Sequence, residues 1–111
     1  MKNFAQNLQS LPSVDDIDRI EIREGGKAIA RIENRPGQAG SLAIYCHLVQ
    51  TYGSIHAESA ERGLALYAEH VADARENPGK HPNIDRLFRV IAERLDLAAC
   101  IVQTQPKGNP G

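Results

Sequence analysis

The stretch RIEIREGGKAIARI, residues 19–32, decides the fold of this chain. Ile20 and Ile22 alternate with charged residues, and a second run of strand-forming residues follows Gly25 and Gly26. A period of two is typical of a strand with one buried face. Paired glycines can take the positive φ angles of a tight hairpin turn. The sequence therefore predicts a β-hairpin over residues 19–32.

Helical patterns surround this hairpin. Upstream, apolar residues at helical spacing predict a short amphipathic helix within the first ten residues, ending before Pro12. Downstream, residues 34–37 (NRPG) predict a turn with Gly37 at positive φ. Three helices are then expected: residues 41–52 with Ser41 as N-cap and Gly53 as terminator, residues 57–76 ended by Asn77-Pro78-Gly79, and residues 82–95 opened by Pro82.

The apolar segment at residues 97–103 has two interpretations. No glycine or proline separates it from the preceding helix, and Ala98, Ala99 and Val102 would extend the apolar face of that helix. Cys, Ile, Val and Thr, however, form strands better than helices, and a continuous apolar run suits a covered strand. Strand is favoured, and helix stays open.

Together these elements predict an α+β fold. A hairpin, three helices and a returning strand make a small antiparallel or mixed sheet with helices packed on one face. At 111 residues the chain is expected to form one globular domain over residues 1–104. Residues 105–111 have nothing apolar to bury and are expected to be a disordered tail.

Composition and charge exclude several functional classes. The net charge of -1 disfavours binding to nucleic acid or an anionic membrane. Aromatic residues make up only 5% of the chain, too few for a base-stacking platform. No apolar run approaches the roughly 20 residues that cross a bilayer, and residues 1–7 lack the apolar core of a signal peptide. A cytosolic protein is expected, with Cys46 and Cys100 as buried thiols.

The loop at residues 35–41, RPGQAGS, is a candidate anion site because it leaves a strand and opens a helix. Free amides of a first helical turn, glycines that allow close approach, the Ser41 hydroxyl and the Arg35 cation suit a phosphate or carboxylate. The spacing matches neither a Walker A loop nor GxGxxG. A plain turn followed by an N-cap would use the same residues, and this interpretation also stays open.

A second candidate loop covers residues 77–83, NPGKHPN, again at a helix start. Lys80 and His81 beside free amides suit an anion, although an ordinary connection between helices also needs only Gly and Pro. If both helices begin at the same end of the sheet, Arg35, Lys80 and His81 converge on one anion.

The expected long helix contributes a third candidate. Gly63 and His70 share one of its stripes, and glycine inside a helix costs about 0.5–1 kcal/mol relative to alanine. Either a neighbouring helix or a ligand must approach the backbone at Gly63. Asp73 lies three residues after His70 and is placed to orient its imidazole as a general base requires, although such a pair is usually solvated.

Candidate ligand-binding residues are therefore Arg35, Gly37, Gly40, Ser41, Gly63, His70, Lys80, His81 and Asn83. The four histidines lack the i, i+4 spacing that places two metal ligands on one helical face, so neither a metal site nor a cofactor is expected. Ser41, Ser54 and Ser59 lack a nucleophile elbow, and no catalytic residue is assigned.

Three stretches resemble a family of small bacterial proteins of unknown function: IENRPG (residues 32–37) with its following helix, GLALYAEH (63–70) and NPGKHPNID (77–85). The similarity extends from about residue 11 to residue 95. These motifs are not catalytic signatures. The resemblance implies a cytosolic bacterial protein and no activity, cofactor or site residue.

Three functions remain. The leading hypothesis is a binding or accessory protein with a small-anion site, for phosphate or a carboxylate metabolite, at the two helix starts. An interaction module or homodimer that uses a helix face or a sheet edge is the second. An enzyme with His70 as base and Asp73 as its orienting partner is the third, and the sequence favours binding over catalysis.

Overall fold

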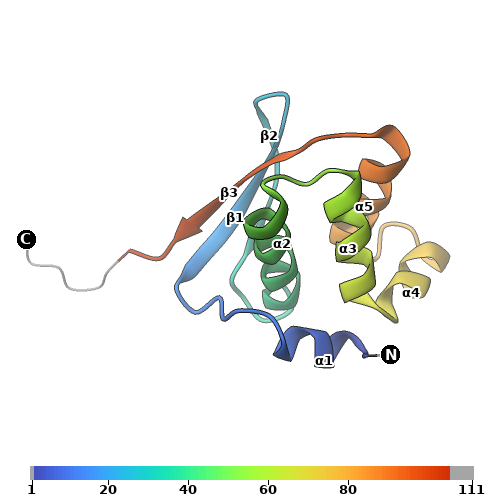
Figure 1. Ribbon diagram of the computed structural model, residues 1–111, viewed down its shortest axis with the longest axis horizontal. Coiled ribbons are helices and arrows are strands. Elements are labelled where there is room, and N and C mark those ends of the chain that lie inside the picture. The colour runs from blue at the N-terminus through green and yellow to red at the C-terminus, as the bar shows by residue number, and fades with distance from the viewer. Residues whose placement is uncertain (1, 106–111) are drawn as a thin grey trace, which may run out of the picture.

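The computed structural model describes residues 2–105 (Figure 1). In chain order its elements are α1 (Phe4–Gln9), β1 (Ile17–Glu24), β2 (Lys27–Glu33), α2 (Ala39–Tyr52), α3 (Ala57–Tyr67), α4 (His70–Glu76), α5 (Pro82–Glu93) and β3 (Ala98–Gln103). The α+β class is confirmed, as are the hairpin and the helix that opens at Pro82. The alternatives for residues 97–103 are also resolved, because β3 is a strand.

The sheet is antiparallel throughout, with strand order β2-β1-β3. Ile20 of β1 lies between Ile32 of β2 and Ile101 of β3, so the apolar residues of the three strands share one face. Gly25 and Gly26 take φ angles of 58° and 83° in the hairpin turn, as the glycine pair predicts.

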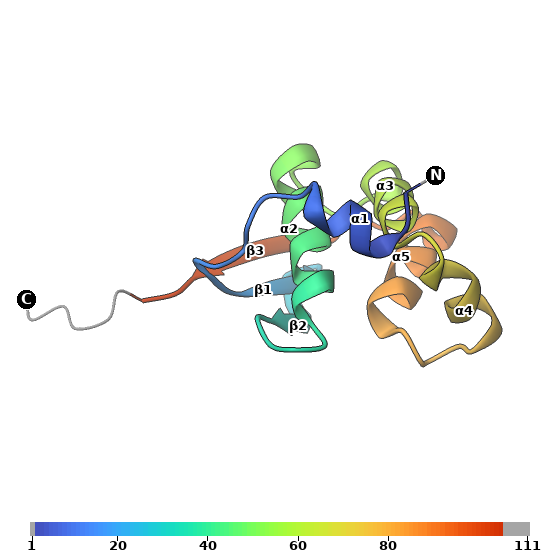
Figure 2. The same ribbon diagram turned by 90° about the horizontal axis from the view of Figure 1, so that it is seen from below.

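Helix α2 covers the apolar face of this sheet (Figures 1 and 2). Leu42, Tyr45 and Leu48 are fully buried there, together with Ile20 and Ile22 of β1. Helices α3 and α5 pack beside α2, and the same core continues between them. The opposite face of the sheet carries arginine and glutamate side chains joined in ion pairs.

The expected long helix at residues 57–76 is wrong: it is two helices, α3 and α4, separated at Ala68. Ala68 has φ 53° and ψ -119°, a conformation that L-residues rarely adopt. No glycine or proline marks this break. Tertiary contacts hold it, since α1 packs against α3 and the Phe4 amide donates to the Glu69 carboxylate immediately after the break.

Two smaller expectations are wrong, and a third concerns residues that the structure does not describe. Ser41 is not an N-cap, because a turn of hydrogen bonds from Gln38 and Ala39 back to Arg35 starts the helix earlier. Cys100 is exposed on β3, whereas Cys46 is buried. The expected tail falls, apart from residue 105, outside the described residues.

Among the described helices, none is long and apolar enough to cross a membrane.

Candidate functional site

Two adjoining cavities lie where α1, the start of α2 and the start of α5 meet. Their volumes are about 400 Å³ and 380 Å³. The first, here called the apolar lobe, is lined by Phe4, Leu8, Ala39, Gly40 and His70. The second, the polar lobe, is lined by Arg31, Gln38, Lys80, Pro82, Asn83 and Arg86. Both are lined by Gly37, Ser41, Tyr67, His81 and Ile84, so one wall joins the lobes.

The two helix starts singled out from the sequence meet at this cavity. Gly40 and Ser41 belong to the first turn of α2, and Asn83 to the first turn of α5. Amides in a first turn have no acceptor within their own helix, and the helix dipole favours an anion beside them. The buried Tyr45 ties the two helices together, because its hydroxyl donates to the Asn83 carbonyl oxygen.

Arg86 is a lining residue that the sequence analysis missed. Its Nη1 donates to the Tyr45 hydroxyl at 3.1 Å and to Asn83 Oδ1 at 2.9 Å, and its guanidinium lies over the Tyr45 ring. Within residues 2–105, no carboxylate lies within 4 Å of this guanidinium. Arg86 therefore brings a positive charge and spare N–H donors to the polar lobe.

Asp73 contacts both Lys80 and His81 of the second loop. Its Oδ2 lies 2.6 Å from His81 Nε2 and 3.0 Å from Lys80 Nζ. The hydrogen bond to His81, and then the one to Lys80, lowers the pKa of Asp73 to about 2. One carboxylate thus holds both side chains at the rim of the polar lobe, and it offsets part of the positive charge of Lys80.

His70 lines the apolar lobe but does not pair with Asp73. Its ring packs edge-on against Phe4, with centroids 4.6 Å apart, and lies 5.9 Å from the His81 ring. Asp73, on the same short helix as His70, contacts His81 at the start of α5 instead. The expected His70–Asp73 pair is therefore wrong, and the aspartate–histidine pair of this protein joins α4 to the start of α5.

The common wall of the two lobes carries two hydroxyl groups. Tyr67 donates to Ser41 Oγ at 2.6 Å. Burial raises the pKa of the Tyr67 phenol far above its usual value, so this hydroxyl keeps its proton. The Tyr67–Ser41 pair is thus a neutral, hydrogen-bonded part of the wall between the lobes.

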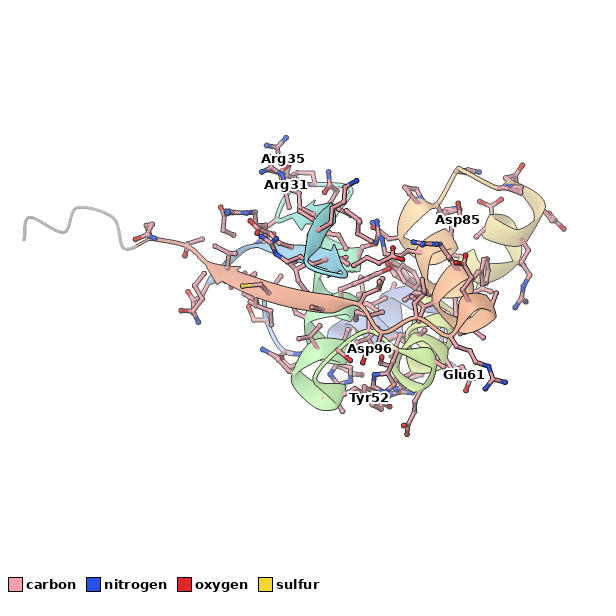
Figure 3. All side chains as sticks on the ribbon, turned by 90° about the horizontal axis from the view of Figure 1, so that it is seen from above. Arg31, Arg35, Tyr52, Glu61, Asp85 and Asp96 are labelled. Atoms are coloured by element: carbon pink, nitrogen blue, oxygen red, sulfur yellow. The ribbon has the colours of Figure 1, made fainter. Side chains whose placement is uncertain are left out.

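Two predicted residues lie elsewhere. Arg35 is exposed and pairs with Glu33, which Arg31 also approaches. Figure 3 shows both arginines together at the outer edge of the molecule. Gly63 is buried, and a Cβ built on it would lie 2.8 Å from Leu87 Cδ1 and 2.9 Å from Leu48 Cδ1. Gly63 therefore allows α2, α3 and α5 to pack closely, and it does not line the cavity.

A second polar cluster lies away from this cavity. Ser54 donates to Asp96 Oδ1 and lies 3.1 Å from His56 Nδ1. Ile55 and Leu97 pair as a short bridge beside it, so the cluster staples the loop after α2 to the loop before β3. Figure 3 shows Asp96 and Tyr52 at this end of the molecule, far from Asp85 at the start of α5.

Within the part of the chain that the structure describes, no three His, Cys, Asp or Glu side chains are grouped as a metal site requires. The fold and the cavity define the class of this protein: a small α+β protein with a helix-covered sheet and a two-lobed cavity between helix starts. Residues 4–101 match the model of the family described as "Uncharacterized protein conserved in bacteria (DUF2322)", and the chain belongs to that family. Comparisons with curated proteins and with solved structures give no match.

Proposed function

We propose that this protein binds a small anion, a phosphate or a carboxylate metabolite, in the polar lobe. The observation that carries the proposal is Arg86, a half-buried guanidinium that lines the lobe and has no carboxylate within reach among the described residues. Burying a charge without a partner is costly, and an anionic ligand supplies that partner.

Neighbouring groups support the same function. Lys80, His81 and Asn83 line the same lobe at the start of α5, and Ser41 lines it from α2. Such a set of donors from two helices recognises an anion without catalysis. The protein is taken to be cytosolic, because its two cysteines are free thiols.

Thermal unfolding with added sodium phosphate or sodium acetate tests this proposal. Ligand that binds only the folded state stabilises it by RT ln(1 + [L]/Kd), so at ten times Kd the melting temperature should rise by several degrees. Arg86→Gln should abolish the shift. Arg89→Gln is the matched control, because Arg89 lies on the same helix but pairs with Glu24 and Glu93 outside the cavity. No shift with millimolar anion, or an equal shift in Arg86→Gln, contradicts the proposal.

Self-association through β3 is a second candidate function, and the composition of that strand favours it. Strand β3 is an edge strand, and its sequence AACIVQ contains no charged residue and no proline. Proteins normally protect an edge with such residues, as the opposite edge β2 does with Lys27, Arg31 and Glu33. An unprotected edge is suited to antiparallel pairing with a second copy of itself.

Sedimentation at micromolar concentration tests this candidate. A dimer is expected for the wild-type chain and a monomer for Cys100→Lys, which places a charge on the exposed edge. Ile29→Lys, at an exposed position on β2, should leave the dimer intact. A wild-type chain that stays monomeric at all concentrations tested rules this candidate out.

A further inference from the structure

The two lobes differ in chemistry although they share a wall. Phe4, Leu8 and Ile84 give the apolar lobe a hydrocarbon lining. Arg86, Lys80 and Asn83 give the polar lobe charges and hydrogen-bond donors. Ligand sites commonly pair an apolar pocket with a few convergent polar groups that set orientation. This cavity therefore matches a ligand with an apolar end and an anionic end.

The size of the apolar lobe limits that apolar end. Its volume of about 400 Å³ lies at the lower part of the range for small-molecule pockets. Phe4 and Leu8 of α1 close one side, and Phe4 already packs closely on Gly40, where an added Cβ would lie 2.9 Å from the phenyl ring. A single ring or a branched alkyl group fits within this space.

The charges around the polar lobe limit the anionic end. Three lining side chains are permanently cationic: Arg31, Lys80 and Arg86. Glu33 lies 3.6 Å from Arg31 and also pairs with Arg35, and Asp73 lies 3.0 Å from Lys80 and also contacts His81, so Arg31 and Lys80 each have a carboxylate nearby. Among these three side chains of the described residues, Arg86 is the one with no carboxylate within 4 Å, and a single carboxylate of a ligand is enough to pair with it.

We infer that the ligand class is a monocarboxylate bearing a compact apolar group, such as a phenyl ring or a branched alkyl chain. This inference rests on the proposed anion binding and specifies its ligand. The carboxylate pairs with the free N–H donors of Arg86, and the apolar group occupies the lobe under Phe4 and Leu8.

Isothermal titration calorimetry with three probes, acetate, phenylacetate and inorganic phosphate, tests this inference. Phenylacetate should bind the wild-type chain at least tenfold more tightly than acetate, because only its ring reaches the apolar lobe. Phosphate, which is partly dianionic at neutral pH, should bind no more tightly than acetate.

Ala39→Leu is the diagnostic variant, since Ala39 is half-buried and lines the apolar lobe but not the polar lobe. The added side chain fills the lobe, so the tenfold preference should disappear while acetate affinity changes less than twofold. Ala43→Leu, one turn further along α2 and outside both lobes, should keep the preference.

The outcomes separate this inference from the proposed function. Equal affinity for acetate and phenylacetate, or tighter binding of phosphate, overturns the monocarboxylate class and leaves anion binding standing. Failure of all three probes to bind overturns anion binding itself. Because the comparison of probes uses the wild-type chain, the test holds even if Ala39→Leu does not fold.

Discussion

Asp73 contacts Lys80 and His81 at the rim of the cavity, and this arrangement makes stability depend on pH. Its pKa is about 2 in the folded protein, against an ordinary value of 3.8, because it accepts hydrogen bonds from His81 and Lys80. A carboxyl whose pKa is lowered on folding contributes stability above its unfolded pKa and loses it as the pH falls through the folded value.

We expect Asp73→Asn to lower the free energy of unfolding at pH 5–7, and the difference from wild type to shrink as the pH falls from about 4 to about 2. Urea denaturation at a series of pH values measures it. Asp15→Asn is the control, because Asp15 makes no ion pair within residues 2–105. A difference that stays constant down to pH 2 would show that the Asp73 contacts do not depend on its charge.

The effect of replacing Gly63 on stability depends on the side chains packed against it. Replacing glycine with alanine inside a helix normally stabilises by about 0.5–1 kcal/mol. Here the new methyl group would meet Leu48 and Leu87, which are both fully buried, and overpacking costs about 1–3 kcal/mol.

We therefore expect Gly63→Ala to destabilise the fold by about 1 kcal/mol, measured by urea denaturation. Ala65→Gly at an exposed position of the same helix reports the intrinsic cost of glycine and should also destabilise, by about 1 kcal/mol. A stabilised Gly63→Ala would mean that the contact between the helices is loose.

Sequence reasoning found the loops of the site but not its central cation. Ser41, Lys80, His81 and Asn83 were found because turn residues at a helix start are visible in a linear sequence. Arg86 was missed, although it lies three residues after Asn83 on the same helix and bonds its side chain. An arginine on a helix surface is ordinarily solvated, and only its missing carboxylate partner distinguishes this one.

At the scale of elements, the break between α3 and α4 shapes the site. If the helix ran unbroken through residues 67–70, α4 would continue along the axis of α3. Asp73 on α4 would then no longer lie beside His81 at the start of α5. Helical periodicity extends through the break, so the sequence predicts one helix. The contacts of α1 with α3 and of Glu69 with Phe4 outweigh this local preference.

Ala68 adopts an unfavourable backbone conformation at the break between α3 and α4. A residue with a Cβ at positive φ costs on the order of 1–3 kcal/mol, and glycine avoids most of that cost. We expect Ala68→Gly to stabilise the protein by about 1 kcal/mol in urea denaturation. Ala65→Gly again serves as the matched comparison, because its backbone is helical. If both variants lose stability equally, Ala68 is not strained.

At the scale of the whole molecule, one hydrophobic core joins the sheet to the helices packed on it. This core buries Cys46 but not Cys100. Cys46 is 2% exposed within that core, and burial raises the pKa of its thiol to about 11. Cys100 is exposed on the outer edge of the sheet. The reactivity of the Cys100 thiol therefore reports on the native surface, and that of the Cys46 thiol reports on opening of the core.

We expect one thiol per chain to react with an aromatic disulfide reagent in native buffer, and the second to react only as the protein unfolds. Cys100→Ser should remove the fast reaction, and Cys46→Ala should remove the slow one. Fast reaction of both thiols in the native protein would contradict a core that opens only on global unfolding.

The sequence by itself determined the hairpin, the helix opened by Pro82 and the α+β class, and it favoured the last strand without excluding a helix there, because alternation, turn residues and caps act over a few neighbouring residues. Only the tertiary structure decided where the helix over residues 57–76 breaks, which histidine Asp73 binds, and that Arg86 lacks a carboxylate partner. These features arise between segments far apart in the chain. Their energies depend on distance and burial in the folded molecule, which local patterns do not encode.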